Sequence, residues 1–135
     1  MKTQLATSES AKLIELGVSP ERASEICMDF NGSYAYVHGE EAQLVRDCVN
    51  GRFYVDECRI FTLADILDIL PKEFNVSGTS ARLQVYNHPA EYWIASYVTY
   101  DGGTLTYQNP CSAEKELIDA LYSLLVWCLE KGYVK

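Results

Sequence analysis

The clearest opportunity for chemistry in this sequence is a single thiol. Cys111 directly precedes a predicted helix that Ser112 would cap. A helix N-terminus carries positive potential, which lowers the pKa of a thiol beside it and raises the fraction of reactive thiolate. His88, at the end of a predicted strand, could serve as the base. A Cys-dependent enzyme using Cys111 with His88 is therefore one hypothesis, although neither residue lies in a recognised hydrolase motif.

The other motifs of enzymes and metal sites are absent from the sequence. It contains no glycine-rich phosphate loop, no G-x-S-x-G, no H-E-x-x-H and no calcium loop. The five cysteines are scattered without a C-x-x-C, and neither histidine has a second ligand at metal-binding spacing. We therefore expect no metal and no cofactor, reduced thiols that are mostly buried, and on balance no enzyme.

Two carboxylates three residues apart, Asp65 and Asp68, lie on one face of a predicted helix. They could be a catalytic pair or half of a metal site. No histidine or further carboxylate joins them at suitable spacing, so a solvated helix face is the favoured interpretation.

Aromatic side chains form the second group of candidate functional residues. On the predicted strand 92–100, we expect Ile94 and Val98 to face the C-terminal helix, which leaves Trp93 and Tyr97 on the second face. Trp127 lies at the edge of that helix's apolar stripe, whereas Cys128 lies within the stripe and is predicted to be a core thiol. Because Trp and Tyr often anchor protein contacts, Trp127, Trp93 and Tyr97 are the predicted interaction residues. The alternative, that both sheet faces are covered and these residues are core, stays open.

These residues must be positioned by elements that the sequence pattern predicts to be an α+β fold. It comprises an N-terminal helical hairpin, a central short helix, and a three-stranded antiparallel meander packed on a long C-terminal helix. A DNA-reading helix-turn-helix is disfavoured, because Arg22 is the only basic residue of the second helix. The expected helices are 8–16, 19–28, 40–49, 62–71 and 112–132; the expected strands are 33–37, 52–55, 82–86, 92–100 and 104–108.

The bulk composition bounds the class of protein. A chain of 135 residues is expected to form a single globular domain, 1–135. Its net charge of −8, with 11 basic and 19 acidic side chains, is spread evenly and leaves no basic patch. Nucleic-acid binding and attraction to an anionic membrane are therefore disfavoured. With no apolar run of membrane-spanning length and no signal-like start, we expect a cytoplasmic protein.

Three stretches resemble a family of small uncharacterised proteins of gut anaerobic bacteria, often encoded among prophage or mobile-element genes. They are AKLIELGVSPERASEIC (11–27), FTLADILDILPKEF (61–74) and ELIDALYSLLVWCLEKGYV (116–134), with YWIASYV (92–98) similar to a tryptophan-bearing strand of that family. The resemblance implies a bacterial or phage-linked cytoplasmic protein of α+β fold. It brings no active-site residues with it, because the similar stretches are helix starts, apolar stripes and a strand.

The leading hypothesis is a small acidic, non-enzymatic interaction module that binds a protein partner or a second copy of itself through aromatic surface. The alternatives are the Cys111–His88 enzyme and an acidic protein that mimics nucleic-acid charge to inhibit a basic partner.

Overall fold

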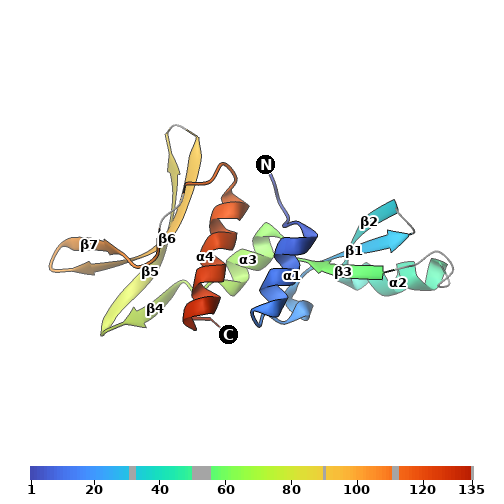
Figure 1. The fold of residues 1–135 in the computed structure, drawn as a ribbon, viewed down its shortest axis with the longest axis horizontal. Helices are drawn as coiled ribbons and strands as arrows, with labels where there is room; N and C mark the ends of the chain where they lie inside the picture. Colours follow the sequence, from blue (N-terminus) through green and yellow to red (C-terminus); the bar gives the residue numbers. More distant parts are fainter. Residues whose placement is uncertain (31–32, 50–55, 90, 111–112, 135) are drawn as a thin grey trace. The chain divides into compact units, whose positions relative to one another are not determined.

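The computed structural model describes residues 1–30, 33–49, 56–89, 91–110 and 113–134 (Figure 1). Their contacts divide the chain into two compact units: Thr3–Asp65, here the N-terminal unit, and Ile66–Lys135 together with Met1–Lys2, the C-terminal unit. The single domain expected over residues 1–135 stays a prediction.

The N-terminal unit is organised around a three-stranded antiparallel sheet with strand order β2-β1-β3. Its central strand is buried on both faces: Ile26 and Met28 pack with Ala42 of a helix, and Cys27 is buried on the opposite face. The elements of this unit, with the helix that follows it, are α1 (Thr7–Glu15), η1 (Pro20–Arg22), β1 (Glu25–Phe30), β2 (Ser33–His38), α2 (Gly39–Val49), β3 (Asp56–Ile60) and α3 (Leu63–Ile69).

The predicted second helix, 19–28, is wrong. Only one turn of 3-10 helix forms, at Pro20–Arg22, and the chain then enters β1. The apolar spacing that suggested a helix face belongs to a central strand, whose residues are buried whichever face they point to. The predicted helices 8–16 and 40–49 and strand 33–37 correspond to α1, α2 and β2. The predicted strand 52–55 lies outside the described residues.

The Asp65 carboxylate caps the N-terminus of α3 and links it by hydrogen bonds to Ser24, the residue before β1. The Asp65 carboxylate accepts hydrogen bonds from the backbone N–H of Thr62 at 2.9 Å and of Ser24 at 2.9 Å, and from the Ser24 hydroxyl at 2.8 Å. The Asp65 N–H donates in turn to the Thr62 hydroxyl at 3.2 Å, which completes a capping box. Asp65 therefore anchors two elements, whereas Asp68 on the same helix is exposed, as expected of a solvated face.

The C-terminal unit contains a four-stranded antiparallel sheet with strand order β4-β5-β6-β7 and one long helix alongside it (Figure 1). Two tight turns join its strands, Ser77-Gly78 with φ of 52° and 87°, and Gly102-Gly103 with φ of 59° and 86°. Positive φ at both central residues is the geometry that matches the twist of a hairpin. The elements are β4 (Glu73–Val76), β5 (Thr79–His88), β6 (Tyr92–Asp101), β7 (Thr104–Tyr107) and α4 (Leu117–Lys131).

Helix α4 buries one stripe against the sheet. The helix begins at Leu117, so its N-cap is Glu116. This start is five residues after Ser112, the cap expected from the sequence, which lies outside the described residues. Gly132, with φ of 78°, ends the helix as predicted. The buried residues of the helix are Ile118, Ala120, Leu121, Leu124, Leu125 and Cys128.

The predicted arrangement of the fold is therefore wrong. The chain is α+β, but its described residues form two antiparallel sheets where one was expected, β1 replaces the second helix of the hairpin, and the meander has a fourth strand, β4. Strand β4 was missed because its four residues, Glu73–Val76, alternate too briefly to be distinguished from a loop.

The junction at Asp65 predicts a specific loss of stability. Asp65→Asn replaces a charged acceptor of three hydrogen bonds, and we expect the free energy of unfolding to fall by about 2 kcal/mol. Urea denaturation followed by circular dichroism measures it. Glu15→Gln removes the same charge from an exposed position of the same unit and should change stability by less than about 0.5 kcal/mol. Equal effects of the two substitutions would contradict this role of Asp65.

Candidate functional site

One face of the β4–β7 sheet carries exposed tyrosines. The register pairs Tyr86 with Ile94, Gln84 with Ser96, and Val98 with Tyr107, so the side chains of these pairs share one face. Tyr86, Tyr100 and Tyr107 on this face are 47%, 64% and 54% exposed. We name this surface, with its floor of Ile94, Ser96 and Val98, the tyrosine face.

Two hollows follow one another along the tyrosine face. The first has a volume of about 410 Å³ and is lined by Gln84, Tyr86, Ile94, Ser96 and Tyr107. The second, about 350 Å³, is lined by Thr79, Ser80, Arg82, Val98 and Tyr100. Because the lining positions advance together along β5 and β6, the two hollows lie one after the other on this face, and we refer to them together as the groove.

The groove is almost neutral. The first hollow has no side chain that is charged at neutral pH, and its polar groups are the Gln84 amide and the hydroxyls of Ser96, Tyr86 and Tyr107. In the second, Arg82 is paired with Glu73 at 3.6 Å, and Glu73 also accepts a hydrogen bond from Ser80 at 3.2 Å. Such a lining suits aromatic stacking and hydrogen bonding to neutral groups.

The opposite face of the sheet packs against α4, and this reverses the predicted orientation of β6. Tyr97 is fully buried, its ring 6.4 Å from that of Trp127, and it is hydrogen-bonded to Cys128. Ile94 and Val98 were expected to face the helix and instead form the floor of the tyrosine face. The alternation of β6 was read correctly, but the wrong face was assigned to the core.

The predicted interaction residues lie on or beside this helix-covered face. Trp127 is half-buried in an aromatic cluster with Phe74, Tyr97 and Tyr133, with Phe74 and Tyr133 stacked 4.2 Å apart. Trp93 is also half-buried, and its backbone exchanges hydrogen bonds with Glu114. Tyr97 is a core residue, and its hydroxyl donates to the Pro71 carbonyl at 2.6 Å. The cluster supports the end of α4.

Tyr86, Tyr100 and Tyr107 were not singled out from the sequence. A usable signal was present, because the turn at Gly102-Gly103 sets the register that places Tyr107 opposite Val98. With that register, assigning Tyr97 to the core would have left Tyr100 and Tyr107 on the other face.

The predicted Cys111–His88 pair cannot be placed. Cys111 lies outside the described residues, and of His88 only the backbone, at the end of β5, is described. Within the described part of the chain, no group of three or more His, Cys, Asp or Glu residues is arranged to hold a metal ion.

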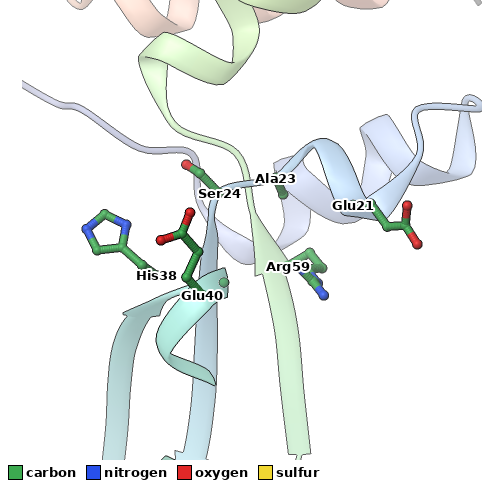
Figure 2. A pocket seen from close by; sticks show the side chains of 7 residues that line it. Glu21, Ala23, Ser24, His38, Glu40 and Arg59 are labelled. Atoms are coloured by element: carbon green, nitrogen blue, oxygen red, sulfur yellow. The ribbon is translucent and has the colours of Figure 1, made fainter. Parts of the chain in front are cut away.

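The N-terminal unit has a larger and more polar hollow of about 560 Å³ (Figure 2). Figure 2 shows His38 and Glu40 on one side of the view and Arg59 and Glu21 on the other, so the charged groups are spread along its rim. The imidazole of His38 lies 3.0 Å from the Glu25 carboxylate, but the neighbouring Ser24 hydroxyl donates to Asp65. The Ser24 hydroxyl proton is therefore used in the hydrogen bond to Asp65 at the start of α3, and His38 does not activate this serine as a nucleophile. The residues that line this hollow are Glu21, Ala23, Ser24, His38, Gly39, Glu40 and Arg59.

We found no protein-family model, curated protein or solved structure that matches the chain. Among the described residues, no helix has the length and apolar character needed to cross a membrane. Function is therefore inferred from the residues and their geometry.

Buried Cys128 predicts a response to alkaline pH. Burial raises the pKa of its thiol from about 9 to about 11, and burial likewise raises the pKa of Tyr97. The unfolded chain releases the thiol proton first, so the stability present below pH 9 is lost as the pH rises through 11. Cys128→Ala should make this decline shallower in urea denaturation between pH 8 and pH 11 under reducing conditions.

The control is Ser123→Ala, which removes an exposed, non-titrating hydroxyl from the same helix and should leave the pH dependence as in the parent chain. A Cys128→Ala variant with an unchanged slope would contradict the assignment.

Proposed function

We propose that this protein is a small non-enzymatic interaction module that binds an extended, uncharged segment of a protein partner along the tyrosine face. The observation that carries the proposal is the exposure of Tyr86, Tyr100 and Tyr107 around a groove, on the sheet face opposite α4. Tyrosine gives a large contact area with few rotatable bonds and a hydroxyl that can hydrogen-bond, which makes it a frequent anchor of protein contacts.

The shape of the groove supports an extended ligand. Its floor and end wall, Ile94, Ser96, Val98 and Tyr100, are alternate residues of one strand. At about 3.3 Å per residue this row spans about 20 Å, the length of about six residues of extended peptide. A compact small molecule would fill one hollow and leave the other empty.

The charges of the groove support a neutral segment. The Arg82–Glu73 pair leaves little net charge at one hollow, and the other has none. The exposed Gln84 amide can bond to peptide N–H and C=O groups, which every extended segment presents. Nucleic acid is a poorer ligand, because stacking platforms for bases lie in basic grooves.

The biological setting is part of the proposal. The resemblance to small proteins of gut anaerobes supports a bacterial or prophage origin, and the scattered reduced thiols support a cytoplasmic location. The net charge of −8 keeps such a module soluble without defining its partner.

Selection from a peptide library tests the binding surface. A random dodecamer library displayed on phage would be selected on the full chain. Synthetic peptides from the selection would then be titrated by calorimetry. We expect neutral sequences to be enriched, and Tyr86→Ala or Tyr107→Ala to weaken their binding at least about tenfold.

The matched control is Tyr34→Ala, which removes an exposed tyrosine from the other unit and should leave affinity unchanged. Peptides that bind all three variants equally would overturn the assignment of the site. Loss of peptide binding through dimerisation of the chain, seen by sedimentation, would identify a second copy as the occupant and contradict a separate partner.

A further inference from the structure

The N-terminal unit places two cysteines opposite each other on neighbouring strands. Cys27 of β1 pairs with Cys58 of β3 in the antiparallel register, so both side chains point to the same face of the sheet. Neither cysteine is in a disulfide. Opposed residues of antiparallel strands have Cα atoms about 4.5–5.5 Å apart, within the range of about 4.4–6.8 Å that a disulfide spans. A bond between the two sulfurs therefore needs no rearrangement of the strands.

The two thiols differ in access in a way that suits stepwise oxidation. Cys58 is exposed and Cys27 is buried, yet both line one hollow of about 230 Å³. An oxidant can reach Cys58 from solvent, and the Cys27 sulfur then lies beside the product. The hollow is lined by Thr7, Cys27, Asp29, Tyr34, Glu57 and Cys58.

A tyrosine completes the row across the sheet. Tyr36 of β2 pairs with Cys27 on the side away from Cys58, and a hydrogen bond to the Cys27 thiol raises the pKa of the Tyr36 hydroxyl. Cys58, Cys27 and Tyr36 are thus directly paired neighbours in one row across the three strands.

We propose that Cys27 and Cys58 form a thiol–disulfide site that low-molecular-weight disulfides oxidise. The Cys58 thiolate attacks one sulfur of the small disulfide, whose S–S bond breaks and whose first half leaves as a thiol after taking up a proton. Cys27, losing its proton, attacks the Cys58 sulfur of this mixed disulfide and releases the second half as a thiol. The protein loses two protons and two electrons, and the small disulfide gains them.

The charge around the site selects among such oxidants. Asp29 and Glu57 flank the thiols, and residues 3–65 carry five basic and eleven acidic side chains. A cationic disulfide is drawn to this surface and an anionic one is repelled. Cystamine should therefore react faster than oxidised glutathione by several-fold at low ionic strength, and the difference should shrink in concentrated salt.

Peptide mapping tests the proposal on the full chain, because trypsin places each of the five cysteines on a different peptide. The native protein would be treated with cystamine, alkylated and digested without reduction. We expect one dominant linked pair, 23–46 with 53–59, in a monomeric product. Cys58 bound to cysteamine with no linked pair, or linked mainly to the Cys48 or Cys111 peptide, would overturn the proposal.

Two variants separate the steps of the reaction. Cys27→Ser should stop at a stable mixed disulfide on Cys58, whereas Cys48→Ser should form the 27–58 bond at the parental rate. Should Cys27→Ser fail to fold, the peptide map of the parent chain decides by itself. Equal rates with cystamine and oxidised glutathione at low salt would contradict the selection by charge.

Discussion

The antiparallel register of β5 with β6 is the constraint on which the C-terminal unit depends. It pairs Gln84 with Ser96 and Tyr86 with Ile94, and so decides which side chains reach solvent and which meet α4. A shift of one residue would put Tyr86 and Tyr97 on the same face, so that keeping Tyr86 exposed would turn Tyr97 outward as well. Because Tyr97 fills the space beneath Trp127 and Cys128 and donates to the Pro71 carbonyl, such a shift would leave a cavity and an unpaired carbonyl.

The same pairing explains why one face is available for binding. The unit has one long helix, and its apolar stripe packs on the Tyr97 face of the sheet. On the other face, Ser96 and Val98 are buried at the base of the groove. The larger, exposed tyrosines on the neighbouring strands form its sides. The groove is preformed, because its floor is β6, a strand that is hydrogen-bonded to β5 on one side and to β7 on the other.

Local signals allowed several elements to be predicted from the sequence, and long-range pairing explains those that failed. The predicted helix 62–71, the end of the C-terminal helix at residue 132 and the break between the predicted strands 92–100 and 104–108 depend on neighbouring residues. Residues 25–30 have helical spacing, yet become a strand because β2 and β3 pair with them from both sides. The face of β6 could not be assigned because Tyr97 and Val98 are comparable core candidates until α4 is placed. Because the wrong face of β6 was assigned to the core, the sequence named Trp93 and Tyr97 as candidate binding residues, whereas the exposed face carries Tyr86 and Tyr107.

Hydroxyl-radical footprinting, with mass spectrometry of the free chain and of the chain bound to a selected peptide, tests the binding surface most directly. In the free chain Tyr86, Tyr100 and Tyr107 should be modified readily and Tyr97 hardly at all. With peptide bound, Tyr86 and Tyr107 should be protected, while Tyr34 in the other unit keeps its reactivity. Protection elsewhere, with Tyr86 and Tyr107 unchanged, would contradict the tyrosine face as the binding surface.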